Sequence, residues 1–86
     1  MQKPIRIEAA DTDERTQIGD ALAKFARKSG RLETGRKEGK FFLSHEGGCD
    51  VGGEPIKKGE TFYLDPETGE LLCARHGEQR RRERTP

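Results

Sequence analysis

The sequence predicts a small α+β domain whose apolar core is too small to stabilise it alone. Of the 86 residues, 29% are hydrophobic and 38% are charged, and such polar small chains commonly need an additional cross-link. The two cysteines and two histidines form two clusters, His45-x3-Cys49 and Cys73-x2-His76, separated by a segment that favours a β-hairpin. Two such pairs can build a tetrahedral zinc site, so we expect one structural Zn²⁺ to hold the fold together.

All four expected zinc ligands come from these clusters: His45, Cys49, Cys73 and His76. Glycines 47 and 48 permit a tight turn within the first cluster. The second cluster has the i, i+3 spacing of a first helical turn, which brings both side chains to one face. If His45 does not bind, Asp50 or Glu46 could replace it. A disulfide between the cysteines, or two unrelated buried thiols, is the alternative, and reducing compartments disfavour the disulfide.

The segment from 45 to 76 also resembles a known class of zinc domain. A ligand-bearing turn, a hairpin and a ligand pair opening a helix resemble the treble-clef arrangement of LIM-like zinc fingers. The Pro-Ile-x-x-Gly-Glu segment of those fingers is present here at 55–60. The chain departs from the pattern at Gly52, where a second cysteine is usual. The resemblance implies a zinc-binding hairpin followed by a short C-terminal helix, and it does not extend to residues 1–44.

The region 1–40 is expected to contain a strand or arm, an amphipathic helix and a basic loop. Alternation around Ile5 and Ile7 favours an extended segment at 3–9. A helix is expected at 13–29, because Asp11–Asp13 can cap it and apolar residues recur at helical spacing from Ile18 to Ala26. The polar segment 31–40 contains two glycines and favours a connector.

The region 41–78 is expected to form the zinc-binding hairpin module. Strands are expected at 41–43 and 70–72, with a hairpin that pairs 55–56 with 61–64 through a turn at 57–59. A second turn is expected at 65–69, where Pro and Gly occupy typical turn positions. The basic region 79–86 is expected to be a disordered tail.

Charge is distributed unevenly. Residues 41–74 contain two basic and seven acidic residues, whereas the flanking regions each carry a net charge of +3. This asymmetry favours contact between the basic segments and nucleic-acid phosphates. The alternative is a solvated helix face whose cations complement the helix dipole. The expected phosphate contacts are Lys24, Arg27, Lys28, Arg31, Arg36, Lys37, Arg80, Arg81 and Arg82.

We therefore expect a small zinc-binding regulatory protein that contacts nucleic acid. The alternative is a protein–protein interaction adaptor that uses the zinc hairpin as its binding surface. Catalysis is not expected, because so short a chain has little room for a substrate pocket. The sequence has no apolar run of membrane-spanning length and no secretory leader at its start, so we expect a cytoplasmic protein without membrane contact.

Overall fold

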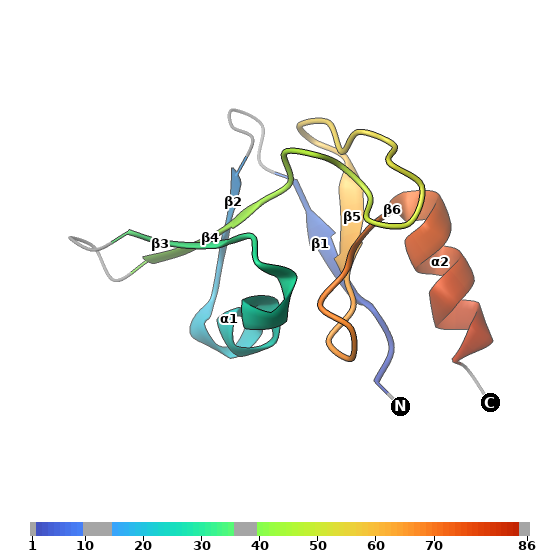
Figure 1. The fold of residues 1–86 in the computed structure, drawn as a ribbon, viewed down its shortest axis with the longest axis horizontal. Helices are drawn as coiled ribbons and strands as arrows, with labels where there is room; N and C mark the ends of the chain where they lie inside the picture. The colour runs from blue at the N-terminus through green and yellow to red at the C-terminus, as the bar shows by residue number, and fades with distance from the viewer. Residues whose placement is uncertain (1, 10–14, 36–39, 85–86) are drawn as a thin grey trace.

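The computed structural model describes residues 2–9, 15–35 and 40–84, and within these ranges it contains two three-stranded antiparallel sheets and two α-helices (Figure 1). The first sheet has the order β1-β5-β6, and its strands are β1 (Ile5–Glu8), β5 (Thr61–Leu64) and β6 (Leu71–Cys73). The second sheet has the order β2-β4-β3, and its strands are β2 (Arg15–Ile18), β3 (Leu32–Gly35) and β4 (Lys40–Ser44).

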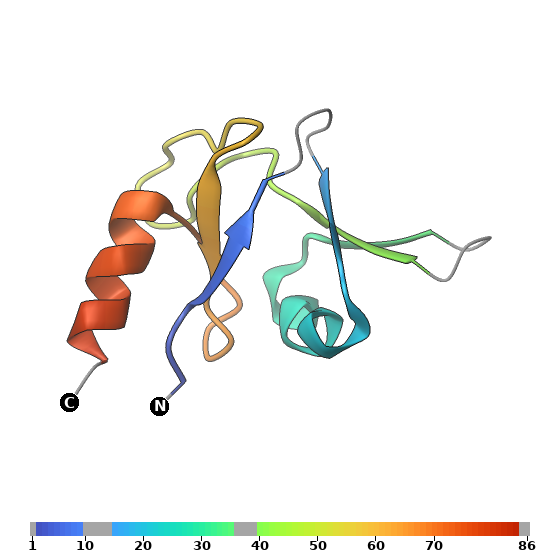
Figure 2. The same ribbon diagram turned by 180° about the vertical axis from the view of Figure 1, so that it is seen from behind.

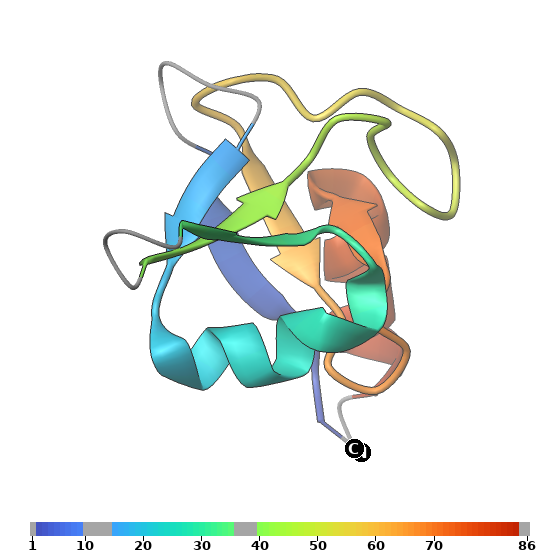
Figure 3. The same ribbon diagram turned by 60° about the vertical axis from the view of Figure 1, so that its left-hand side comes forward.

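The helices cover different parts of the two sheets. Helix α1 (Asp20–Ala26) follows β2 and continues into a 3₁₀ turn, η1 (Arg27–Ser29), which Gly30 ends at a positive φ of 71°. Helix α2 (Ala74–Glu83) packs on the face of the first sheet that points away from the second sheet (Figures 1 and 2). Figure 3 shows the two sheets stacked one behind the other, with α1 running across one end of both.

The main core lies between the two sheets and α1. Alternate side chains of β5 point to opposite faces, as the strand period of two requires. Phe62 and Leu64 therefore enter the main core with Leu43 of β4, whereas Tyr63 packs with Cys49 and Leu72 on the face that α2 covers. The first sheet is thus buried on both faces, and its α2 face carries the candidate site.

Gly77 permits the close approach of α2 to this sheet. A Cβ atom at that position would overlap the Tyr63 ring, so only glycine fits between the helix and β5. The Tyr63 hydroxyl in turn donates a hydrogen bond to Glu78 of α2. Both contacts fix the first turns of the helix over β5, next to the end of β6.

The expected helix at 13–29 is wrong in its first part. Residues 15–18 form β2, in which Thr16 and Ile18 are buried while Arg15 and Gln17 are exposed. The burial of residues 15–18 alternates with a period of two, but the helical spacing that begins at Ile18 masks this pattern in the sequence. Pairing with β4 favours the strand over the helix. The extended backbone of Gly19 separates β2 from α1, and residues 13 and 14 lie outside the described ranges.

Three further expectations are corrected. Residues 32–35 are not a connector but strand β3, which pairs with β4, and 36–39 lie outside the described residues. The hairpin pairs β5 with β6 and not with residues 55–56. The tail is helical to Glu83, because Arg80 and Arg84 bind acidic side chains of the β5–β6 turn.

Other parts of the fold agree with the sequence. The strands expected at 3–9, 41–43 and 70–72 are confirmed as β1, β4 and β6. The turn at 65–69 is also confirmed, since the amide of Gly69 donates to the Asp65 carbonyl at 2.7 Å and Gly69 has a φ of 81°. These segments carry their own local signals, namely alternation or turn residues. The observed layout does not reproduce a treble clef, and the first sheet joins β1 to strands beyond residue 60.

Candidate metal centre

Four potential ligand atoms converge at the N-terminal end of α2, and each lies within 4.8 Å of the others. The residues are Cys49, Glu54, Cys73 and His76. Cys49 and Glu54 come from the loop between β4 and β5, Cys73 ends β6 and caps α2, and His76 lies in the first turn of α2. Two separate segments of chain, 49–54 and 73–76, are therefore brought together at one point, and this group could hold a metal ion.

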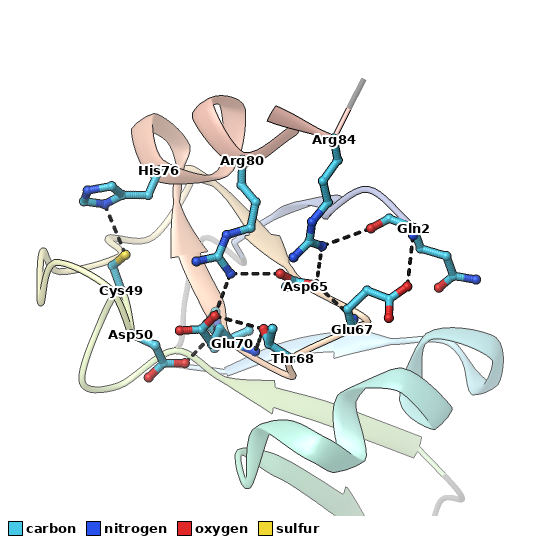
Figure 4. Close-up of polar contacts among 11 residues, drawn as sticks. Gln2, Cys49, Asp50, Asp65, Glu67, Thr68, Glu70, His76, Arg80 and Arg84 are labelled. Carbon is cyan, nitrogen blue, oxygen red and sulfur yellow. Dashed lines mark hydrogen bonds and ion pairs between the residues drawn. The ribbon is translucent and has the colours of Figure 1, made fainter. Parts of the chain in front are cut away.

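The histidine lies at the centre of the group. Its Nδ1 atom is 3.4 Å from the Cys49 sulfur, a contact drawn in Figure 4. The same atom is 3.3 Å from the Cys73 sulfur and 3.0 Å from Glu54 Oε2. The Cys73 thiol also donates a hydrogen bond of 3.0 Å to Glu54 Oε2. Both thiols are free, so the sulfur atoms are available to a ligand. Nitrogen, carboxylate oxygen and two sulfurs thus all face one small volume.

Two glycines shape the loop that supplies Cys49 and Glu54. Gly48 has a φ of 73°, and a Cβ atom there would overlap the Glu54 carbonyl. At Gly52 a Cβ atom would overlap the Glu54 carboxylate and lie 2.6 Å from Cε1 of His76. Backbone hydrogen bonds of 2.8 Å from Cys49 to Glu54 and from Gly53 to Cys49 close the loop. The missing side chains therefore leave the room in which Glu54 and His76 meet.

The next residue, Asp50, ties this loop to the rest of the fold. Its amide donates to the Leu71 carbonyl at 2.8 Å, and its Oδ2 accepts the Leu71 amide at 2.8 Å. Its Oδ1 accepts a hydrogen bond of 2.7 Å from Arg31, whose other terminal nitrogen donates to the Gly48 carbonyl at 2.8 Å. Arg31 and Asp50 therefore hold the Cys49 loop against β6 from outside the ligand group.

Burial and mutual contact shift the pKa values of Cys73 and Glu54. Burial raises the pKa of the Cys73 thiol above its ordinary value, and the hydrogen bond to Glu54 adds to this effect. The same hydrogen bond, donated by Cys73, lowers the pKa of the Glu54 carboxyl. Both shifts favour the proton on the Cys73 sulfur. Thiolate ligation releases that proton, which makes metal binding dependent on pH.

The structure does not bring His45 to this group. His45 follows β4, is 3% exposed, and has its ring centroid 5.5 Å from that of Phe62, on the core face of β5. Cys49 packs with Tyr63 on the opposite face, so β5 lies between the two expected partners. The three residues between His45 and Cys49 form a turn in which the Gly48 amide donates to the His45 carbonyl at 3.1 Å, but this turn does not bring His45 to the ligand group.

Glu54 stands where His45 was expected, and sequence reasoning missed it. Carboxylates at positions 46 and 50 were considered as replacements because they flank the first cluster. Glu54 lies five residues beyond Cys49, and only the return of the chain at Gly52–Gly53 brings it back. The available signal was this glycine pair immediately before an acidic residue.

The expected phosphate contacts fall into distinct groups. Arg31 and Arg80 form internal ion pairs with Asp50 and Asp65. The Arg81 guanidinium lies 5.7 Å from the Tyr63 ring centroid. Four others are exposed and have no ion pair among the described residues, and they are Lys24, Arg27, Lys28 and Arg82. Arg36 and Lys37 lie outside the described residues.

A second polar cluster, also missed, joins α2 to the β5–β6 turn (Figure 4). The fully buried Asp65 side chain accepts hydrogen bonds of 2.8 Å from both Arg80 and Arg84. Arg80 also donates to Glu70 at 2.6 Å. Burial acts to raise the pKa of Asp65, but the two arginines outweigh it and hold that pKa well below its usual range. This cluster anchors the last turns of α2, and the ligand group lies at the first turn.

The fold and the ligand group define a small α+β domain with a possible metal centre. The chain belongs to the family described as a domain of unknown function (DUF8075), whose model matches residues 1–83. That range includes both sheets and both helices. No curated protein and no solved structure matches the chain. Among the described residues, neither helix has the length and apolarity needed to cross a membrane.

Proposed function

We propose that this protein is a zinc-binding domain in which Cys49, Glu54, Cys73 and His76 hold one structural Zn²⁺. The observation that carries the proposal is the convergence of these four ligand atoms within 4.8 Å of one another. The donor set of two sulfurs, one imidazole nitrogen and one carboxylate oxygen suits zinc, which binds all three atom types. Magnesium and calcium prefer sites made of oxygen alone, so the thiolates disfavour them.

The spacing of the ligand atoms supports the same ion. Tetrahedral zinc with bonds of about 2.0–2.3 Å requires its ligand atoms to lie roughly 3.3–3.8 Å apart. Four of the six pairs of ligand atoms lie 3.0 to 3.4 Å apart and the other two lie within 4.8 Å, so small shifts of these side chains are enough to admit the ion. Because protein atoms fill all four positions, no position is left for a substrate, and the role we assign is structural and not catalytic.

Zinc removal provides the test. Chelation is expected to loosen the loop at 48–54 and the first turn of α2, because the ion would join the loop, the end of β6 and the helix at one point. We expect a lower unfolding temperature and less helical circular dichroism, both restored by adding one equivalent of Zn²⁺ and not by Mg²⁺. A protein whose unfolding temperature is the same with and without zinc would refute the proposal.

A second role, contact with nucleic-acid phosphates, is favoured by one further observation. Lys24, Arg27 and Lys28 lie close together on α1 and η1, are exposed, and have no ion pair among the described residues. Arg31 and Arg80 are excluded from this role, because both already neutralise carboxylates within the fold. The proposed contact surface is therefore the α1–η1 segment, and it binds backbone phosphates without reading sequence.

Charge reversal tests this surface. Changing Lys24, Arg27 and Lys28 to glutamate is expected to abolish binding to duplex DNA in filter-binding or anisotropy assays. Stability should change by less than about 1 kcal/mol, because these side chains point to solvent. Each lost phosphate contact should reduce the slope of log affinity against log salt by about 0.9.

The matched control is Glu83→Lys on α2, which alters an exposed charge far from α1 along the chain. It should leave the fold intact and should not weaken binding. Unchanged DNA binding by the triple variant would remove the α1–η1 surface from the proposal and would favour a protein partner.

A further inference from the structure

A groove with a volume of about 1450 Å³ lies between β3 and the loop that runs from β4 to β5. One wall is formed by residues 30–33, and the other by 46–48, 53 and 55–58. His45 lines it as well, with its ring packed against Phe62 of the core. The metal ligands are not among the residues that line this groove, so it is a separate feature of the same loop.

Cationic side chains outnumber acidic ones around the groove. Arg15, Arg31, Lys57 and Lys58 line it, against Glu33 and Glu46. Arg31 forms an ion pair with Asp50, and a guanidinium nitrogen of Arg15 lies 3.9 Å from Glu33 Oε1. Lys57 and Lys58 are exposed and have no ion pair within the described part of the chain. Two adjacent ammonium groups are therefore available to an anion entering the groove.

The rest of the lining is apolar or bare backbone. Ile56 is buried in the main core, and Leu32 packs against that core. Both residues line the groove together with Pro55. Gly30 and Gly53 have nothing within 4 Å of the position that a Cβ atom would take, so a ligand can approach the backbone there. An apolar wall beside uncompensated lysines suits a ligand with a flat apolar part and a phosphate.

We propose that this groove binds a nucleotide unit, with its phosphate at Lys57 and Lys58 and its base against Leu32, Pro55 and Ile56. The unit could be a free nucleotide or one residue of a single-stranded nucleic acid, since both offer the same chemistry. If the ligand is a single-stranded nucleic acid, the inference rests on the proposed contact with nucleic acid. It then adds a binding site separate from the α1–η1 surface.

Binding of two probes to the zinc-loaded full chain tests the groove. The probes are a short fluorescein-labelled oligothymidylate and adenosine diphosphate. In K57A/K58A, binding of the oligothymidylate should weaken, and its log-affinity against log-salt slope should fall by about 0.7 for each lost phosphate contact. Binding of adenosine diphosphate should be lost. Glu46→Gln removes an acidic group from the groove and should tighten binding of either probe.

The matched control is K3A/R6A, which removes two exposed cations of the N-terminal segment outside the groove and should leave binding unchanged. Thermal melts should show that the lysine variant is as stable as the wild type, because neither side chain has an ion pair with the described residues that would be lost. Equal oligothymidylate binding by wild type and K57A/K58A would overturn the groove and leave the α1–η1 surface standing.

The two probes also separate the two proposals. Binding of adenosine diphosphate alone, lost in K57A/K58A, would support the groove as a site for free nucleotides and would contradict the proposed nucleic-acid contact. If the wild type binds neither probe, both the proposed groove site and the proposed contact with nucleic acid are overturned.

Discussion

Replacement of Cys73 by serine is expected to abolish zinc binding and to produce the largest loss of stability of any single change at the metal centre. Cys73 supplies a thiolate at the junction of β6 and α2, so its replacement removes a ligand at the point where the strand passes into the helix. Zinc ligation contributes apparent free energies of about 10–16 kcal/mol in zinc-finger peptides, which exceeds the stability of most small domains. The measurements are zinc content after dialysis and thermal unfolding followed by circular dichroism.

Two comparison variants sharpen this result. Glu54→Ala should retain zinc with weaker affinity, because the Glu54 side chain is 37% exposed and water can take its place. His45→Ala should retain a full equivalent of zinc, because His45 lies on the opposite face of β5, although the cavity it leaves beside Phe62 should cost stability. One bound equivalent of zinc and an unchanged melting curve in Cys73→Ser would contradict the assigned ligand set.

Replacement of Asp65 by alanine is expected to cost about 3–5 kcal/mol of unfolding free energy, as measured by urea denaturation. Asp65 is fully buried, and its removal leaves Arg84 without its carboxylate and Arg80 with Glu70 alone. The last turns of α2 should then loosen from the β5–β6 turn. Glu83→Ala is the control, because Glu83 is exposed on the same helix, and it should change stability by less than about 0.5 kcal/mol.

The same cluster predicts how stability depends on pH. The arginines lower the folded-state pKa of both Asp65 and Glu70, so these carboxyls bind protons more weakly in the folded state than in the unfolded state. Their contribution is fully present above the unfolded pKa values of about 4 and is lost as the pH falls through the lower folded values. Acid unfolding of Asp65→Asn should therefore depend less steeply on pH below about 4. Identical pH profiles for this variant and the wild type would show that the cluster does not stabilise the fold.

The parts of the fold that sequence analysis predicted correctly are those with local causes. Alternation at Ile5 and Ile7 defines β1, and the Asp65–Gly69 turn is specified by its own proline and glycine. The helical spacing from Ile18 onward was also real, but only the part after Gly19 forms α1. The four residues of β2 carry too short a pattern to compete with that spacing, and pairing with β4 decides their conformation.

The candidate site was predictable only in part, for a related reason. Cys73 and His76 lie three residues apart, and their spacing on a helix is a local property. Glu54 and Asp65 acquire their roles from contacts with distant segments, Glu54 with the start of α2 and Asp65 with its end. The sequence around Arg80 and Arg84 predicts a disordered tail, because their acidic partners lie 10 to 19 residues earlier in the chain.

The central claim, a structural zinc ion held by two cysteines, one histidine and one glutamate, is tested most directly by zinc X-ray absorption spectroscopy. The protein should be purified without added metal, and elemental analysis should first give about one equivalent of zinc. The fitted first shell should then contain two sulfur atoms at about 2.3 Å and two nitrogen or oxygen atoms at about 2.0–2.1 Å. A folded protein without zinc, or a zinc shell that contains no sulfur, would contradict the account.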